Sequence, residues 1–341
     1  MNTTERTNVL LTGAGFTKNF GGFLASEFHT LIFNDARIQN SPRLREVVLA
    51  NPDFESLYQD ILDGDYTPEE KTTIHDAVFG GYRSLDSAIR MIGFESDARK
   101  PVGKRYTALL DVFLGNRDKT GYVFTLNQDL FLERCYWDHS GPVPLLPGIE
   151  HRELWFSTRF AEPLVDTERV VLPNRQEVDS MRQTFPSPGR SYLIKLHGSC
   201  NWIDNEGEER MIIGGLKSDR IAAVPLLRWY FNIFQEVLHR PNAHLLLIGY
   251  GFGDQHINDV IAECIVNTGL SLYVLGPSSL AGFTKKLTDI NEGRDLLSGL
   301  RGYFPYSLVE VFPADENAPP TQPWLDIMQT AFGFDIDERF R

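Results

Sequence analysis

Four short turns carry the residues of this chain whose types and spacing could do chemistry. They read Gly13-Ala14-Gly15-Phe16-Thr17, Thr125-Leu126-Asn127-Gln128-Asp129, Leu196-His197-Gly198-Ser199 and Gly249-Tyr250-Gly251-Phe252-Gly253-Asp254. Glycines let the backbone approach a ligand closely and turn N–H groups toward an anion such as a phosphate. Amide, carboxylate and imidazole groups can hold water, orient hydroxyl groups and move a proton.

Each turn also has an ordinary structural explanation. The first could be a simple glycine turn, since Lys18 stands where a GxGxxG motif would have its third glycine. Either Asn127 or Asp129 could cap a helix, and a lone histidine such as His197 is more often structural than catalytic. Asp254 could likewise cap a helix after a flexible turn. Two polar groups after one strand, and three glycines in one turn, exceed what these structural roles require.

The turns follow segments that read as buried strands. Continuous apolar strands that alternate with helices indicate a parallel sheet covered on both faces, an α/β Rossmann-like fold. Ligands of such sheets bind beyond the carboxyl ends of the strands, so we expect the turns to meet in one cleft. Five strands are predicted at 9–12, 122–125, 192–196, 243–248 and 270–275, and the fifth of them leads into Gly276. A last strand is expected at Ser307–Phe312.

Other stretches are predicted to be helical or irregular. Helices are expected at 22–33, 226–239 and 255–267, and the chain between about 36 and 118 has helical periodicity without a clear strand. Within it, Ser41-Pro42, Pro52-Asp53 and Thr67-Pro68 read as helix starts. The proline-rich stretch at about 140–190 is expected to be an irregular insertion.

Composition and charge exclude several classes of protein. The chain has 341 residues, 42% of them hydrophobic, and a formal net charge of −13, which argues against a nucleic-acid-binding surface. Its three cysteines form no CxxC pair, so neither a disulfide framework nor a zinc site is expected. No secretory signal, no membrane span and no HExxH, GxSxG or GxxxxGK[ST] motif is present. A reduced, cytoplasmic protein is therefore expected.

Taken in order, the four turns resemble those of the sirtuin family. Sirtuins have a GAG-x-S/T turn, a T-x-N-x-D turn, a His-Gly turn and a later glycine-rich turn, and the likeness here spans about Val9 to Pro277. The segment Ile248–Asn258 is similar to the bacterial sirtuin-like branch found in antiviral defence. Sirtuin deacetylases also hold a zinc module with two CxxC pairs and a Pro-Asp-Phe-Arg stretch, both of which are missing here.

The resemblance implies cleavage of the nicotinamide–ribose bond of NAD+, with water as the acceptor and no metal. Asn127 would hold the nicotinamide-ribose region or the attacking water, and Asp129 would orient the ribose hydroxyls or Asn127. His197 would contact the ribose hydroxyls and act as a base. The cofactor-binding residues implied in this way are Gly13, Ala14, Gly15, Phe16, Thr17, Thr125, Gly249, Tyr250, Gly251, Asp254 and Gly276.

The resemblance also implies a single catalytic domain over residues 1–341. It would have a helical insertion at about 36–118, an irregular insertion at about 140–190 and a C-terminal extension at about 278–341. We expect a homo-oligomer or a protein partner, such as a nucleic-acid-engaging ATPase or an Argonaute-type protein, and no direct contact with nucleic acid or membrane. A zinc-free deacylase, an ADP-ribosyltransferase and a non-catalytic NAD or ADP-ribose sensor remain alternatives.

Overall fold

The computed structural model describes residues 6–19, 21–94, 109–110, 112–113, 115–116, 119–135, 144–149, 169–311 and 321–333. Parts of the predicted helical insertion (95–108), irregular insertion (150–168) and C-terminal extension (312–320, 334–341) lie outside these residues. No helix in the described ranges is both long and apolar enough to cross a membrane.

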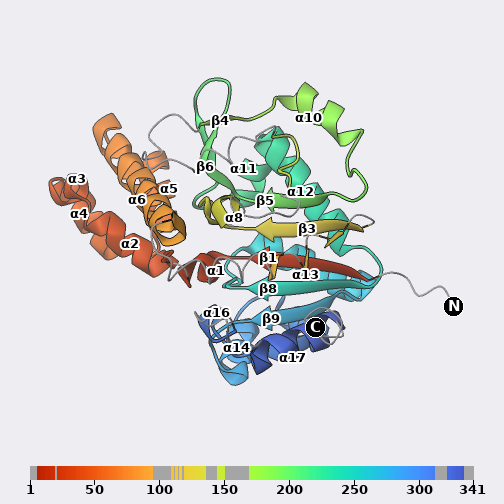
Figure 1. Cartoon of the computed structure of the whole chain (residues 1–341). Helices are drawn as coiled ribbons and strands as arrows, with labels where there is room; N and C mark the ends of the chain where they lie inside the picture. Colours follow the sequence, from red (N-terminus) through yellow and green to blue (C-terminus); the bar gives the residue numbers. More distant parts are fainter. Residues whose placement is uncertain are drawn as a thin grey trace.

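A sheet with six parallel strands forms the centre of the molecule (Figure 1), which confirms the Rossmann-like α/β fold. The strands run in the order β10-β9-β8-β1-β3, and β5 pairs with β3. The short β2 (Gly115–Asn116) is antiparallel to β3. The parallel strands are β1 (Thr7–Thr12), β3 (Lys119–Thr125), β5 (Ser191–Lys195), β8 (Ala243–Ile248), β9 (Ser271–Leu275) and β10 (Leu300–Phe304).

The register brings the four turns to one edge of this sheet. Thr12, the last residue of β1, is paired with Thr125 of β3 and with Ile248 of β8, and Thr125 is paired with Lys195 of β5. All four are the last residues of their strands. The prediction that the turns meet at one edge is confirmed.

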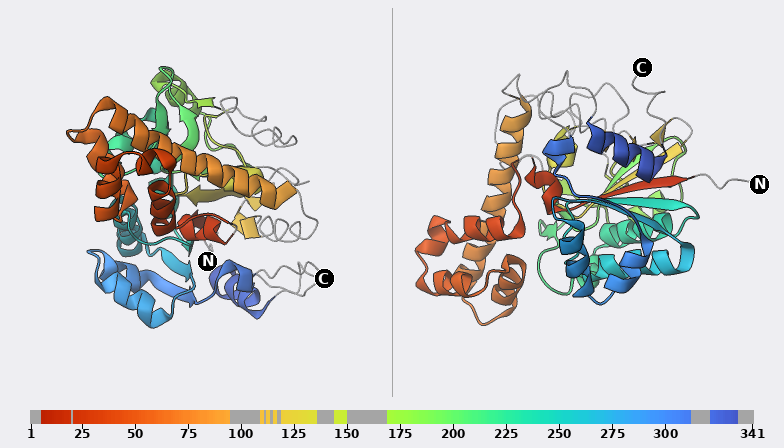
Figure 2. Two further views of the ribbon diagram at one scale, coloured as in Figure 1. Left: turned by 90° about the vertical axis from the view of Figure 1, so that its left-hand side faces the viewer. Right: turned by 90° about the horizontal axis from the view of Figure 1, so that it is seen from below.

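Helices cover both faces of the sheet because its strands are apolar on both sides; every residue of β8 is buried. Helices α12 (Pro225–Leu238) and α13 (Gln255–Thr268) lie on one face, and α17 (Gln322–Phe332) lies on the other (Figure 2). The first two agree with the predicted helices. Together with the sheet and these helices, four shorter helices form what we call the body of the protein: α8 (Phe131–Cys135), α11 (Lys217–Ala223), α14 (Leu280–Thr288) and α15 (Gly293–Gly299).

The helices between β1 and β2 extend to one side of the sheet (Figure 1). They are α1 (Ala14–Lys18), α2 (Ala25–Phe33), α3 (Ala36–Gln39), α4 (Pro42–Ala50), α5 (Phe54–Asp63) and α6 (Pro68–Phe94). We call α2 to α6 the helical unit. It has its own apolar cluster, which includes Phe28, Leu57 and Val78 and is joined by Met211 and Ile213 from the body.

The predicted helix starts in this unit are confirmed. Pro42 occupies the first turn of α4, where a missing N–H costs nothing. The Asp53 side chain accepts a hydrogen bond from the backbone N–H of Glu55 at the start of α5. At the start of α6, the Thr67 N–H donates to Glu70 and the Glu70 N–H donates back to the Thr67 hydroxyl, a capping box.

One segment prediction is wrong. Ser307–Phe312 was expected to be a strand, but Leu308–Val311 form the short helix α16. The reason is local: the N–H and hydroxyl of Ser307 both donate to the Glu310 carboxylate, which favours a helix start. The last strand is instead β10, whose pattern is weak because only Phe304 is fully buried.

The predicted irregular insertion contains regular structure in its described part. Asn174 and Glu177 form a capping box that starts α10 (Arg175–Arg182). The preceding β4 (Val170–Val171) joins β6 (Gly198–Ile203) and β7 (Glu209–Met211) in a separate three-stranded sheet. Periodicity in the sequence does not reveal β4 and β7, because two or three residues are too few to show a period.

The turn after β1 touches the turn after β8, backbone against backbone. The Gly15 N–H donates to the carbonyl oxygen of Gly249 at 2.9 Å, and the Gly13 N–H donates to that of Ile248 at 3.0 Å. Gly249 has φ +68°, and a Cβ there would lie 2.1 Å from the backbone nitrogen of Phe16. Glycine is therefore required at this position for both its conformation and its missing side chain.

Replacing Gly249 with alanine should destabilise the fold by about 3 kcal/mol, because backbone atoms must move to admit the methyl group. Gly253→Ala is the matched control in the same turn, since nothing lies within 4 Å of a Cβ at Gly253. The free energy of unfolding in denaturant measures both variants, and we expect the control to stay within about 0.5 kcal/mol of wild type. Equal stability of the two variants would contradict the contact.

Candidate functional site

A cavity of ≈ 320 Å³ opens at the edge of the sheet where the four turns meet. It is lined by predicted residues from every turn, namely Gly13, Ala14, Gly15, Asn127, Asp129, His197, Gly249, Tyr250, Gly251 and Asp254. The helical unit closes its other side with Phe28, Phe54, Glu55 and Tyr82. The site is therefore built between the sheet and the helical unit.

Three of the predicted residues do not line this cavity or the one next to it. Phe16, Thr17 and Thr125 are buried. The Phe16 ring packs edge-on against Phe131, with 5.9 Å between ring centroids. These three residues are therefore packed beneath the turns that line the cavity. Gly276 lines a neighbouring cavity instead.

Asn127 connects the turn after β3 to the turn after β1. Its side-chain N–H groups donate to the carbonyl oxygen of Gly13 at 3.0 Å and to the Thr17 hydroxyl at 2.8 Å, and its backbone N–H donates to the Thr125 hydroxyl. The side-chain oxygen has no hydrogen-bond partner among the described residues. A fixed amide whose oxygen remains available can accept a hydrogen bond from water or a hydroxyl group.

Asp129 lines the cavity and also binds a helix start. Its carboxylate accepts a hydrogen bond from the backbone N–H of Phe131, the first residue of α8, at 2.9 Å. Burial raises the pKa of Asp129, although the positive charge of Lys195 acts in the opposite direction.

A buried ion pair stabilises the turn that follows β3, which contains Asn127, Gln128 and Asp129. The ammonium of Lys195 lies 2.7 Å from the Glu133 carboxylate, and both side chains are almost completely buried. The same ammonium donates to the backbone carbonyl of Asp129. Nearby, Gln128 donates to the carbonyl of Ile212 at 2.6 Å and accepts from the Tyr82 hydroxyl. The second bond ties the loop to α6 of the helical unit.

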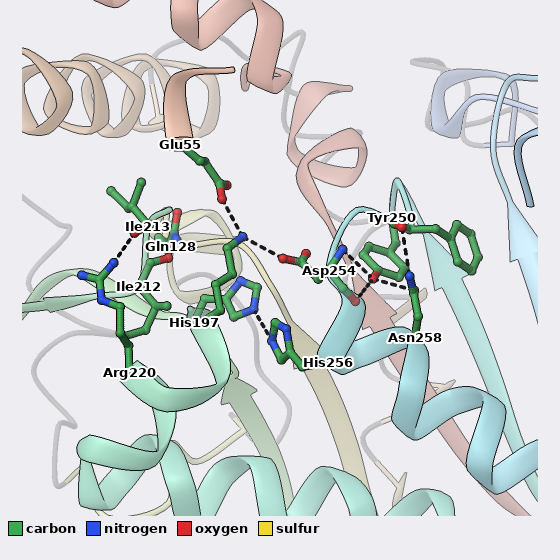
Figure 3. Close-up of polar contacts among 12 residues, drawn as sticks. Glu55, Gln128, His197, Ile212, Ile213, Arg220, Tyr250, Asp254, His256 and Asn258 are labelled. Atoms are coloured by element: carbon green, nitrogen blue, oxygen red, sulfur yellow. Dashed lines mark hydrogen bonds and ion pairs between the residues drawn. The ribbon is translucent and has the colours of Figure 1, made fainter. Parts of the chain in front are cut away.

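Two histidines face each other beside the cavity (Figure 3). The Nε2 atoms of His197 and His256 are 3.1 Å apart. Burial lowers the pKa of His197 to about 3, despite the opposing charge of Asp254. Burial also lowers the pKa of His256. The uncharged ring is therefore the stable form of both histidines at neutral pH.

Lys217 lies between two carboxylates from different parts of the chain. Its ammonium is 2.6 Å from Glu55 of the helical unit and 2.7 Å from Asp254 at the start of α13. Figure 3 shows the carboxylates of Glu55 and Asp254 reaching the same ammonium from different elements, Glu55 from above and Asp254 from the right. Burial raises the pKa of Glu55, whereas the positive charges around Asp254 outweigh its burial and lower the pKa of that carboxyl.

Tyr250 fixes the glycine-rich turn on α13. Its hydroxyl donates to the side-chain oxygen of Asn258 at 2.9 Å and accepts from the Asp254 N–H at 3.3 Å. Asn258 in turn donates to the carbonyl oxygen of Phe252 at 3.0 Å. A turn with three glycines is thereby held in one conformation.

A second cavity of ≈ 280 Å³ adjoins the first and shares a wall with it. The shared residues are Gly15, Leu24, Gly249, Tyr250 and Gly251. The two cavities differ in charge: Glu55, Asp129 and Asp254 line the first together with Lys217, whereas Lys18 and Lys286 line the second, without an acidic residue among its described lining. The charges of the two cavities would match an elongated ligand whose positive end lies in the first cavity and whose negative part lies in the second.

Several of these residues had no sequence signal. Glu55 and Lys217 lie in the first turns of α5 and α11, which are far apart in the chain. Lys195, Glu133 and Gln128 lack a motif. His256 likewise has no predicted role. Among the described residues, one group could hold a metal ion, formed by His197, Asp254 and His256, and it includes no cysteine.

Folding stability should depend on the neutral state of His197. Below pH 6.5 the unfolded chain binds a proton at this residue that the folded protein does not, so stability falls as the pH decreases toward the folded pKa of about 3. His197→Gln should reduce this dependence by at most about 1.4 kcal/mol per pH unit. The melting temperature between about pH 7.5 and pH 5 measures the effect.

His75→Gln provides a control of opposite sign. A hydrogen bond to Glu209 raises the pKa of His75, so this residue stabilises the fold at low pH and loses that contribution as the pH rises. Replacing His75 should therefore make the fall in folding stability at decreasing pH steeper. Identical slopes for wild type and His197→Gln would contradict a buried neutral His197.

Comparison with known proteins agrees with this geometry. A search of curated protein sequences found no significant match. The family model described as SIR2-like domain matches residues 121–292, half of the chain. The match includes Asn127, Asp129, His197 and the glycine-rich turn, and the pairing of β1 with β3 and β8 places Gly13 and Gly15 beside them. The chain therefore belongs to the SIR2-like domain family.

Proposed function

We propose that this protein is an NAD+ glycohydrolase, which splits the nicotinamide–ribose bond with water. The observation that carries the proposal is the pair of adjoining cavities with opposite charge. NAD+ has a cationic nicotinamide at one end and an anionic pyrophosphate in its middle. The acidic first cavity suits the nicotinamide ribose, and the second, with Lys18 and Lys286, suits the adenosine side.

The wall between the cavities fits the phosphates of this substrate. At Gly13 and Gly15 a Cβ atom would come within 2.9 Å of the backbone of Gly249 or Tyr250, so the chain here is bare backbone. Bare backbone is what lets a pyrophosphate pass closely between the two cavities. In this proposal Gly13, Ala14, Gly15, Gly249 and Gly251 bind the pyrophosphate.

The polar residues of the first cavity supply what the bond cleavage requires. When the C1′–N bond breaks, its electron pair goes to the ring nitrogen, and nicotinamide leaves uncharged. Water adds to C1′ and loses a proton, so the products are ADP-ribose, nicotinamide and one proton. Asn127 holds the water, the Asp129 carboxyl faces the positive charge that develops on the ribose, and His197 takes the proton.

The SIR2-like match supports an NAD-related activity, and three features favour water as the acceptor. The chain has no CxxC pairs, it lacks the Pro-Asp-Phe-Arg stretch of the deacetylases, and helical-unit residues close the cavity. We further propose that the enzyme depletes NAD+ in antiviral defence and is switched on by self-assembly or a protein partner. Unrestrained hydrolysis would drain the cell's own NAD+, so control is needed.

Asn127→Ala and His197→Ala should each abolish NAD+ hydrolysis, while the melting temperature changes little for Asn127→Ala because that residue is only partly buried. Chromatography of NAD+ incubated with purified protein, at several protein concentrations, measures the release of nicotinamide and ADP-ribose. Asn40→Ala on the exposed end of α3 is the control. Normal turnover by folded Asn127→Ala would overturn the assignment.

The same assay separates the proposal from other functions. Nicotinamide release that requires an added acyl-lysine peptide or acceptor protein would indicate a deacylase or ADP-ribosyltransferase. Binding of NAD+ in calorimetry without turnover, under every condition of assembly, would indicate a sensor.

Lys286→Glu should raise the KM for NAD+ about fivefold and leave kcat unchanged, because the reversed charge repels the substrate's phosphates. Lys285→Glu is the matched control, since this neighbouring residue of α14 does not line the second cavity. We expect its KM to stay within about twofold of wild type. Equal effects of the two variants would show that the second cavity does not hold the charged part of the substrate.

A further inference from the structure

The side of the first cavity that the helical unit closes is aromatic. Phe28, Phe54 and Tyr82 all line it. The ring centroid of Phe28 lies 4.9 Å from that of Phe54 and 4.8 Å from that of Tyr82, and the planes are tilted by 49° and 47°. The Tyr82 ring is fixed because its hydroxyl donates to Gln128. Aromatic faces attract a cation and pack against a flat ring, so this side of the cavity suits a cationic heterocycle.

Glu55 is the acidic residue on the aromatic side. It follows Phe54 in the first turn of α5, and Figure 3 shows its carboxylate reaching from the helical unit toward Lys217. Oε2 of Glu55 lies 2.6 Å from the Lys217 ammonium, whereas Oε1 has no hydrogen-bond partner in the part of the chain that the structure describes. A carboxylate oxygen that lines a cavity and remains available accepts a hydrogen bond from a ligand N–H.

The other two carboxylates in the described lining have different surroundings. Asp129 already accepts hydrogen bonds from the backbone N–H of Phe131 and from the Thr17 side chain. Asp254 lies at the start of α13, directly after the glycine-rich turn that is proposed to bind pyrophosphate. Glu55 therefore combines an available oxygen with a place beside the aromatic rings.

We propose that Glu55 determines which pyridine base the enzyme accepts, by recognising the carboxamide of NAD+ and rejecting a carboxylate in its place. This inference rests on the proposed NAD+ hydrolysis and names a specificity-determining residue for it. Oε1 of Glu55 accepts an N–H of the carboxamide while the pyridinium ring packs against Phe28 and Phe54. Nicotinic acid adenine dinucleotide has a carboxylate at this position, which offers no N–H and is repelled by Glu55.

The charges around Glu55 agree with this role. Burial raises its pKa, and the Lys217 ammonium acts in the opposite direction. Lys217 also contacts Asp254 at 2.7 Å, so one ammonium is shared between two carboxylates and neutralises Glu55 only in part. A pyridinium ring bound beside Glu55 supplies a second positive charge. The cation and the carboxamide of the same base are thus both favourable partners for this side chain.

The helical unit would then select the leaving group. It lies outside residues 121–292, which match the SIR2-like domain model, whereas the residues proposed to act on water and ribose lie within them. Selection of the base and cleavage of the bond are therefore assigned to different parts of the chain, and a change at Glu55 should alter the first more than the second.

The test compares NAD+ with nicotinic acid adenine dinucleotide as substrates for wild type, Glu55→Gln and Asp60→Asn. Wild type should prefer NAD+ by about 100-fold or more in kcat/KM. Glu55→Gln should lower this ratio by about tenfold or more, because a glutamine amide can donate to the nicotinate carboxylate. Asp60→Asn removes an exposed negative charge from the same helix, outside both cavities, and should keep the ratio within about twofold.

The comparison uses the ratio of two substrates, so an inherent difference in reactivity between the two bases cancels between wild type and variant. An unchanged ratio in Glu55→Gln with a wild-type melting temperature would overturn the proposal. Equal changes in Glu55→Gln and Asp60→Asn would do the same, since they would show an effect of overall charge. Equal hydrolysis of both dinucleotides by wild type would also refute it and would leave the proposed NAD+ hydrolysis intact.

Binding measurements separate this inference from the proposed function. Calorimetry with each dinucleotide on the Asn127→Ala protein, with and without Glu55→Gln, does not depend on turnover. Tighter binding of NAD+ than of the nicotinic acid dinucleotide, lost when Glu55 is replaced, would support the role of Glu55 even if wild type hydrolysed neither compound, a result that would refute the glycohydrolase alone. Equal binding of the two dinucleotides with Glu55 in place would refute the role of Glu55.

Discussion

The backbone contact between the turn after β1 and the turn after β8 is the constraint on which the site depends. Gly15 and Gly249 meet without side chains between them, which fixes the distance between the two strand ends and forms the wall that both cavities share. A Cβ at Gly249 would lie 2.1 Å from the backbone nitrogen of Phe16, so the backbone of one of the two turns would have to shift. The other parts of the site are built outward from this wall: Asn127 binds the Gly13 carbonyl, and Tyr250 fastens the second turn to α13.

Burial and charge act against each other throughout the cavity, and the balance differs from group to group. Burial keeps His197 uncharged and raises the pKa of Asp129 and Glu55. Positive charges outweigh the burial of Asp254 and lower the pKa of its carboxyl, and the negative charges of Asp254 and Glu55 in turn raise the pKa of Lys217 despite its burial. The pKa values of carboxyl groups in a single cavity are thereby shifted in opposite directions, because each group has different charged neighbours.

The helical unit is part of the site, although the sheet supplies the residues expected to react. The contacts that join the unit to the rest of the protein at the site include the ion pair of Lys217 with Glu55 and the hydrogen bond from Tyr82 to Gln128. Both involve groups that are costly to leave unpaired when buried, so separating the unit from the sheet would expose the cavity and break its charge balance. Any signal that shifts the helical unit would therefore act directly on the site, which offers a physical route for control by assembly.

The sequence by itself determined the parallel sheet, the order of the four turns and the candidate residues on them, because apolar strands and glycine turns are local patterns that do not depend on distant partners. It also determined the helix starts at Pro42, Asp53 and Thr67, where each capping group lies within a few residues of its partner. Only the tertiary structure decided which groups surround those residues. Lys217 meets Glu55 from 162 positions away, and His256 meets His197 across a whole α/β unit. Such pairs leave no periodicity in the chain, since folding alone brings them together, and the charge of the cavity follows from them.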